Sequence, residues 1–114
     1  EESSAHQAFK KLVVDSKEGD TQLTLKELAP VRLIKNKFYN DVQELYKTAP
    51  NVDQLQQLLG RARAKKGMFE GDLVEGELEI GQIAGLIHDI KPVNKIVEDI
   101  MDEFEEAKNI FLNF

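Results

Sequence analysis

Cysteine and tryptophan are both missing from this 114-residue sequence, and proline occurs only three times. Without cysteine the chain can form no disulfide, no thiolate metal site and no cysteine nucleophile, and this composition fits a reducing compartment. No apolar run approaches the ~20 residues needed to span a bilayer. The opening EESS also lacks the basic and apolar regions of a signal peptide. We therefore expect a cytoplasmic protein that does not enter a membrane.

Basic residues are in the minority, with 15 Lys and Arg against 21 Asp and Glu and a formal net charge of −6. A dedicated nucleic-acid binder normally has a basic surface, so no nucleic-acid partner is expected. A basic cluster at Arg61–Lys66 is followed directly by an acidic run at Glu70–Glu79. Charge runs of this kind are usually solvated surface, although the basic cluster could instead meet an acidic partner or a cofactor phosphate.

Apolar and polar residues along the rest of the chain recur with the spacing typical of helices and short strands. Apolar residues at helical spacing predict four helices, near Ala5–Asp15, Phe38–Ala49, Val52–Ala62 and Val93–Phe111. Two runs rich in β-formers predict strands, at Thr21–Leu25 and Pro30–Ile34. The predicted fold class is mainly α with a small two-stranded β element (α+β). Because two strands alone are marginal, they must pack on the helices or on another partner.

Local signals set the expected helix ends. Ser4-x-x-Gln7 matches a capping box for the first helix, and Asn51 with Gln54 matches another for the third. Gly60 interrupts the third helix at a cost of about 1 kcal/mol relative to alanine. Basic residues as far as Lys66 nevertheless suit an extension of that helix, because cations are favourable near a helix C-terminus.

Five of the seven glycines lie in one segment, Gly67–Pro92, which we call the glycine-rich segment. Glycine is tolerated where the backbone takes φ > 0 or closely approaches another group. The segment therefore predicts either a shaped backbone surface or a simple turn between elements. Its densest part is Gly81-Gln82-Ile83-Ala84-Gly85, with Gln82 the one polar side chain between two glycines. The following residues predict a short helix over Ile83–Ile90, which Lys91-Pro92 ends.

Four stretches carry a resemblance to a known family. They are EESSAH at the start, LTLKELAPVRLIKNKFY at Leu23–Tyr39, LLGRARAKKGMFEGD at Leu58–Asp72 and GMFEGDLVEGELEIGQIAGLIHDIKPV at Gly67–Val93. In order and spacing they resemble the C-terminal part of the nitronate monooxygenase (2-nitropropane dioxygenase) family. That family is closely related to the FMN-dependent enoyl-acyl-carrier-protein reductase II. The resemblance covers nearly the whole chain and is specific at the level of the superfamily.

The resemblance implies an architecture, an FMN-containing (β/α)8 barrel with a smaller, partly helical domain. By that analogy, residues 1–15 are the helix that follows the last barrel strand. Residues 20–91 are the small cap or substrate domain, and residues 92–114 are a C-terminal helix that returns to the barrel. The barrel strands themselves have no counterpart in these residues.

The resemblance also implies which site residues are present. The family's GQxxG neighbourhood borders the active-site cleft and matches Gly81, Gln82 and Gly85, which become the candidates for lining the pocket or the cofactor site. The family's catalytic histidine and its FMN phosphate loops have no matching positions. We therefore expect no catalytic residue in this chain, no metal site, and no tight FMN binding by these residues alone. His6 and His88 are interpreted as surface residues.

Two classes of function follow from these observations. In the first, the chain is the C-terminal part of an FMN-dependent oxidoreductase that oxidises alkyl nitronates with O2. Alternatively, the parent enzyme reduces enoyl thioesters with NAD(P)H in fatty-acid synthesis, and an acyl carrier protein would then suit the basic cluster. In the second class, the chain is a stand-alone acidic helical interaction domain without catalysis.

The last predicted helix needs a partner surface. Eight apolar residues share one of its faces: Val93, Ile96, Val97, Ile100, Met101, Phe104, Ala107 and Phe111. Helices owe most of their stability to the packing of such a face, so it must fold back on Ala5, Phe9, Leu12 and Val13 or meet another molecule. Because an exposed apolar patch of this length is unusual on a monomer, we expect self-association through Val93–Phe111.

Overall fold

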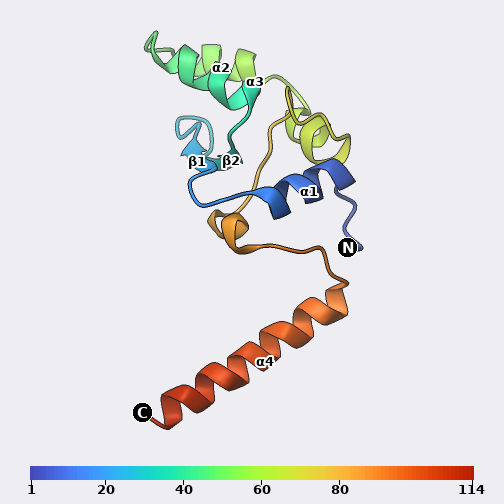
Figure 1. Cartoon of the computed structure of the whole chain (residues 1–114). Coiled ribbons are helices and arrows are strands. Elements are labelled where there is room, and N and C mark those ends of the chain that lie inside the picture. The colour runs from blue at the N-terminus through green and yellow to red at the C-terminus, as the bar shows by residue number, and fades with distance from the viewer.

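The computed structural model describes all residues from 1 to 114. Figure 1 shows a mainly helical chain with one two-stranded antiparallel sheet, which confirms the predicted secondary-structure class. In chain order the elements are α1 (Gln7–Asp15), β1 (Thr21–Thr24), β2 (Val31–Ile34), α2 (Lys37–Tyr46), α3 (Val52–Leu59), the π-helix η1 (Lys65–Phe69), the 3-10 helix η2 (Gln82–Leu86) and α4 (Val93–Leu112).

The sheet is extended by part of the glycine-rich segment. β1 and β2 pair with Thr21 opposite Ile34 and Thr24 opposite Val31. On the other edge of β2, the Ile34 amide donates to the Leu78 carbonyl at 2.9 Å and the Ile80 amide donates to the Arg32 carbonyl at 3.1 Å. The marginal two-stranded ribbon thus gains a short third partner from far along the chain.

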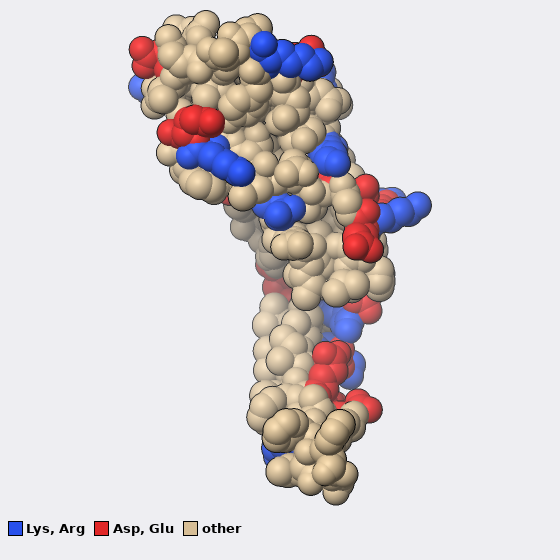
Figure 2. All heavy atoms as spheres, turned by 90° about the vertical axis from the view of Figure 1, so that its left-hand side faces the viewer, with Lys and Arg blue, Asp and Glu red and all other residues tan.

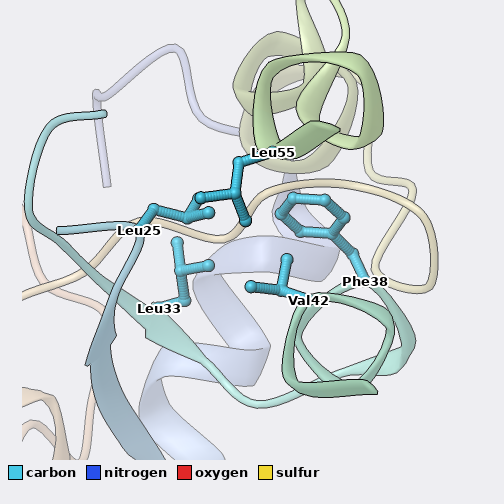
Figure 3. Packing of buried hydrophobic residues seen from close by; sticks show 5 residues of the cluster. All are labelled: Leu25, Leu33, Phe38, Val42 and Leu55. Atoms are coloured by element: carbon cyan, nitrogen blue, oxygen red, sulfur yellow. The ribbon is translucent and has the colours of Figure 1, made fainter. Parts of the chain in front are cut away.

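One core cluster joins the sheet to α2 and α3. Figure 3 shows the side chains of this cluster pointing toward one another, and its members are Leu25, Leu33, Phe38, Val42 and Leu55. Asn36 fixes the start of α2, since its Oδ1 accepts the Tyr39 amide at 2.9 Å. Its Nδ2 donates to the carbonyls of Leu73 and Gly76 at 3.0 and 2.8 Å. This single side chain therefore ties α2 to the glycine-rich segment.

A second core cluster joins α1 to the sheet and to the glycine-rich segment. It consists of Phe9, Ile34 and Leu78. Nearby, the backbones of Gly67 and Gly76 touch, and a Cβ added to Gly76 would lie 2.2 Å from the Gly67 Cα. Only glycine fits at such a contact, so this part of the segment is a shaped backbone surface rather than a simple turn.

The predicted start of the first helix is wrong. The N-cap of α1 is His6, whose Nδ1 accepts the Ala8 amide at 3.0 Å, and the helix begins at Gln7. The Ser4-x-x-Gln7 capping box does not form, because Gln7 lies in the first turn rather than three residues into the helix. The interpretation of His6 as an exposed, locally hydrogen-bonded residue is confirmed.

The predicted extension of the third helix to Lys66 is also wrong. α3 has the predicted Asn51–Gln54 capping box but ends at Leu59. Gly60 then takes φ +66° and Ala62 takes φ +57°, and both values lie outside the right-handed helical region. The chain reverses here and enters η1, a π-helix that begins at Lys65.

The predicted helix over Ile83–Ile90 is replaced by η2, a shorter 3-10 helix that begins one residue earlier and ends at Leu86. Its C-cap Ile87 is extended, with φ −94° and ψ 114°. Ile83, Leu86, Ile87 and Ile90 remain at least 40% exposed. An α-helix there would need a surface on which this apolar face could pack, and the segment instead turns toward α4.

α4 extends away from the rest of the molecule as a single 20-residue helix (Figure 1). None of its residues is buried. Only its first turn lies near α1, where Ile96 lines a surface pocket with Phe9 and Val13, and the rest of the apolar face does not fold back on α1. At its start, the Val93 amide donates to the Glu2 carboxylate at 2.9 Å and the N-terminal ammonium donates to the Lys91 carbonyl at 2.8 Å. Figure 2 shows a largely uncharged surface over α4 with charged atoms along one edge.

No helix has both the length and the hydropathy required to cross a membrane.

Candidate functional site

The predicted pocket residues lie in and beside η2, which packs against α1. Gly81 caps this helix with an extended backbone, and its carbonyl accepts the Ala84 amide at 3.2 Å. Ala84 is only 2% exposed and anchors the helix to the molecule. Gln82, by contrast, is exposed. The 3-10 turn therefore presents Gln82 at the surface while Ala84 holds the turn in place.

Gln82 and Gly85 line one surface pocket of about 500 Å³, together with Glu18, Ile83 and Leu86. Gly81 is not part of its lining, so the structure brings together two of the three candidates. The side-chain amide of Gln82 forms no hydrogen bond within the chain. The pocket thus combines a free amide, one carboxylate and two largely exposed apolar side chains.

Gly85 allows the loop after α1 to reach this pocket. A Cβ on Gly85 would lie 3.0 Å from the Glu18 amide nitrogen and 3.1 Å from the Lys17 carbonyl carbon. The loop is itself fixed, since the Asp20 carboxylate accepts the Lys17 amide at 2.8 Å and Gly19 takes φ +88°. Nothing lies within 4 Å of the corresponding Cβ position on Gly81. Gly85 therefore has a steric reason to be glycine and Gly81 does not.

The basic cluster is mostly engaged within the chain. Arg63 donates from Nε to the Leu59 carbonyl at 2.7 Å, and from its two terminal nitrogens to the carbonyls of Leu58 and Glu75 at 2.8 Å each. Its guanidinium also stacks 4.4 Å from the centre of the Phe38 ring. Lys65 pairs with Glu70 and Lys66 pairs with Asp72. Arg63 is therefore a structural residue, whereas Arg61 is exposed and the side chains of Lys65 and Lys66 are 69% and 48% exposed.

The acidic run contains a residue that the sequence did not single out. Glu77 was grouped with solvated acids, but it is only 7% exposed. Burial, together with repulsion by Glu79 and a hydrogen bond to the Glu79 side chain, raises the pKa of the Glu77 carboxyl from its usual 4.5 to about 7, and the charge of Arg63 partly opposes the shift. The alternation Glu77-Leu78-Glu79-Ile80 is a strand pattern, and it was the available signal that Glu77 and Glu79 share one side of a strand.

Neither histidine lines the Gln82 pocket. His6 caps α1, and its ring covers Gly71, where an added Cβ would lie 2.5 Å from His6 Nδ1. His88 is exposed on the extended stretch after η2 and forms no hydrogen bond. No group of three His, Asp or Glu side chains is arranged to hold a metal ion. The pocket residues can contact and orient a bound molecule, and Glu18 is the titratable residue of the lining.

Sequence comparison then decides the family. The profile described as nitronate monooxygenase matches residues 1–103. The chain belongs to the nitronate monooxygenase family. The matched region contains the whole glycine-rich segment and the Gln82 pocket, and it ends within α4.

Two solved structures are similar to this chain in both sequence and fold. FabK from Thermotoga maritima is 34% identical, with a TM-score of 0.84 over 96% of this chain and 34% of that chain. A methionine-to-alanine mutant of FabK from the same organism is 31% identical, with a TM-score of 0.77 over 97% of this chain and 32% of that chain. This chain thus spans about a third of the length of either FabK chain. No curated protein matches the sequence.

Proposed function

We propose that this chain is the C-terminal part of an FMN-dependent oxidoreductase. One joint observation carries the proposal. The nitronate monooxygenase profile covers residues 1–103, and a FabK chain about three times as long superposes on 96% of these residues. The (β/α)8 barrel implied by the family would then belong to the rest of the longer protein. Residues 1–15 would follow its last strand, residues 20–91 would form the cap, and residues 92–114 would return to it.

The Gln82 pocket fits the ring end of a flavin rather than its phosphate end. A flavin ring needs hydrogen-bonding groups and apolar contacts, and the pocket offers the free Gln82 amide beside Ile83 and Leu86. A phosphate needs cations or clustered backbone amides. The pocket has no Lys or Arg in its lining, and the Glu18 carboxylate would repel a phosphate. In the proposed enzyme, Gln82 and Gly85 border the ring, and the phosphate is held outside this chain.

In this arrangement the flavin supplies the electron transfer when bound, and the chain supplies orientation and shielding. The Gln82 amide can donate to or accept from one polar atom of substrate or ring. Gly85 keeps the pocket open at the point where the Lys17–Asp20 loop comes closest. Ile83 and Leu86 are 62% and 72% exposed, and in the complete enzyme they would exclude water from the same cleft.

Two substrate classes suit such an enzyme. The family profile favours oxidation of alkyl nitronates with O2 as electron acceptor. Both FabK structures favour the second candidate, an enoyl-acyl-carrier-protein reductase II that reduces an enoyl thioester with NAD(P)H. The pocket residues suit either substrate, since a free amide can hydrogen-bond a nitronate oxygen or a thioester carbonyl.

The position of α4 also supports a longer enzyme. The FabK superposition leaves out only 4% of this chain, whereas α4 has 20 residues. Most of α4 therefore lies within the part that matches FabK, and about two-thirds of the FabK chain lies outside that match and is available to cover the helix. We propose that its apolar face packs on the outside of the barrel, and that the exposure of this face in residues 1–114 reflects the missing part.

Two assays on the full-length natural protein test this function. O2 uptake that depends on an alkyl nitronate would identify the monooxygenase, and NAD(P)H oxidation that depends on an enoyl thioester would identify the reductase. Gln82→Ala should lower kcat or raise KM for the active substrate by about tenfold or more, as expected for loss of a positioned hydrogen bond, with unchanged thermal stability. Unchanged kinetics in this variant would refute the role of Gln82, and activity in neither assay would refute both reactions.

A further inference from the structure

The Gln82 pocket contains one charged side chain. Its lining consists of Glu18, Gln82, Ile83, Gly85 and Leu86, so Glu18 supplies its ionisable group and no Lys, Arg or His of the lining opposes that charge. The fixed charge of the lining is therefore negative. A molecule that enters the pocket lies near this charge and near the free amide of Gln82.

The carboxylate of Glu18 is not paired within the chain. It is exposed and takes part in none of the molecule's ion pairs. Lys17 and Lys35 are the nearby cations in the sequence and the sheet, and both are exposed and lie outside the lining. The Lys17–Asp20 loop itself carries one cation and two anions, a formal charge of −1. The negative charge at the pocket is therefore not cancelled by an ion pair.

Several contacts hold the backbone of Glu18 beside the pocket. The Lys17 amide donates to the Asp20 carboxylate at 2.8 Å, and the Lys35 amide donates to the Asp20 carbonyl at 2.9 Å. On the pocket side, a Cβ on Gly85 would lie 3.0 Å from the Glu18 amide nitrogen. The loop therefore keeps its negative charge next to the pocket whether or not a ligand is bound.

We infer that Glu18 is a specificity-determining residue, which disfavours anionic ligands in the Gln82 pocket and leaves uncharged polar ligands to the Gln82 amide. This inference rests on the proposed function, in which the pocket receives the substrate beside the flavin ring. Discrimination between ligands commonly uses a repulsive group against the wrong one as well as attraction to the right one. Here the carboxylate is the repulsive group and the amide is the attractive one.

The two polar side chains of the pocket differ in what they can distinguish. An amide both donates and accepts hydrogen bonds, so Gln82 suits a neutral carbonyl and a negatively charged oxygen alike. A carboxylate repels only the charged one. Of the two candidate substrates, the alkyl nitronate is the anion, and its binding is the one that Glu18 should weaken.

Calorimetric titration of the full-length, FMN-loaded protein at pH 8 tests this role. Hexanoate and hexanamide are the probes, because they have the same aliphatic chain and differ in charge. The ratio of the hexanoate Kd to the hexanamide Kd should fall about threefold in Glu18→Gln and about threefold again in Glu18→Lys, as for changes of one exposed charge. Glu106→Gln, an exposed and unpaired position on α4, should leave this ratio at the wild-type value.

Salt separates an electrostatic role from a structural one. At about 1 M salt, where the Debye length is about 3 Å, the difference in ratio between the wild type and Glu18→Gln should disappear. A difference that persists in high salt would show a change of shape rather than of charge, and would overturn the inference. Equal ratios in both proteins at low salt, or no saturable binding of either probe, would overturn it as well.

The flavin content of the same preparations separates this inference from the proposed function. A dialysed full-length protein that holds no FMN would contradict the proposed function and the role of Glu18 together. A protein that retains FMN but whose Kd ratio does not respond to Glu18→Gln would contradict the role of Glu18 alone. Because Glu18 is exposed and unpaired, Glu18→Gln should keep the wild-type unfolding midpoint, and this variant decides the outcome if Glu18→Lys does not fold.

Discussion

Gly81 and Gly85 flank the same side chain, yet only one of them is sterically required. The Gly85 Cα faces the backbone of Glu18 at close range, whereas Gly81 faces open space with an ordinary φ of −78°. The two glycines of the motif therefore have different structural roles. Gly85 allows the Lys17–Asp20 loop to approach the pocket closely, and the space next to Gly81 is open.

Alanine at the two positions should separate these roles. Gly85→Ala should destabilise the protein by about 1–2 kcal/mol, because its Cβ forces the Glu18 backbone to move. Gly81→Ala should be neutral or stabilise by up to about 1 kcal/mol, because a residue with this φ loses less freedom than glycine on folding. Equilibrium urea denaturation of both variants checks the difference. Equal destabilisation would contradict the steric argument.

Glu77 should make the stability of the protein depend on pH. Its pKa is about 7 in the folded state and about 4.5 when exposed, so the folded state binds the proton more tightly. This stabilising contribution is fully present below about pH 4.5, falls as the pH rises and is lost above about pH 7. Glu77→Gln should remove this slope and raise the free energy of unfolding at pH 8 by roughly 2–3 kcal/mol.

Urea denaturation of the wild type and Glu77→Gln from pH 4.5 to pH 8 measures that slope. Glu106→Gln serves as the matched control, since it removes an exposed carboxylate of the same type and should follow the wild-type curve. If Glu77→Gln and the wild type lose stability in parallel over this range, the burial of Glu77 does not set its titration.

At the scale of elements, Arg63 is the residue of the basic cluster that connects separate parts of the fold. Arg63 caps the C-terminus of α3, because its guanidinium donates to the carbonyls of Leu58 and Leu59, which the helix leaves unpaired. The same guanidinium packs on Phe38 of α2 and binds the Glu75 carbonyl in the glycine-rich segment. Three elements therefore depend on one planar cation.

Arg63→Ala should cost about 2–4 kcal/mol, since it removes three charge-assisted hydrogen bonds and one cation–π contact. Arg63→Lys should recover little of this, because an ammonium cannot reproduce the planar fork. Arg61→Ala, at an exposed neighbour, should change stability by less than about 0.5 kcal/mol. Thermal or urea unfolding compares the three variants, and full rescue by lysine would show that charge alone matters.

Local patterns predicted the elements whose signals lie within a few residues. The apolar periodicity of α4 and the Asn51–Gln54 capping box are of this kind, and both are confirmed. The end of α3 was missed because it depends on Arg63 and on positive φ at Gly60 and Ala62, which helix propensity does not encode. The 3-10 helix η2 packs against α1, and such a contact between segments distant in sequence is not visible in the local pattern of Ile83–Ile90.

The same distinction applies to the candidate site. Gln82 and Gly85 were found because the GQxxG spacing is local, and the structure brings both to one pocket. Glu18 was missed, since it reaches this pocket from a loop more than sixty residues away along the chain. Glu77 was missed because its burial depends on pairing of its segment with β2, and such long-range pairing is not visible in a run of acidic residues.

For the whole molecule, the unpaired face of α4 is the most consequential feature. Ile100 and Phe104 are 58% and 56% exposed, and fully burying each would contribute roughly 1.5–3 kcal/mol. Residues 1–114 produced alone should therefore self-associate through this face. Ile100→Gln with Phe104→Gln should give a monomer in sedimentation equilibrium. Asp102→Asn with Glu106→Gln, on the opposite side of the helix, should not alter the association.

A well-folded monomer of residues 1–114 at every concentration would contradict the need for a partner surface. The full-length protein should behave differently if the barrel covers α4. The double change at Ile100 and Phe104 should then lower its unfolding midpoint, because the variant loses packing against the barrel rather than contacts between copies.

The claim that these residues complete a flavin enzyme is tested most directly by the visible absorbance of the full-length natural protein after extensive dialysis. The account predicts about one FMN per chain in that protein. It predicts no bound flavin in residues 1–114 alone, where the pocket offers ring contacts but no phosphate site. A full-length protein that neither retains nor takes up FMN would contradict the account and favour an interaction domain without catalysis.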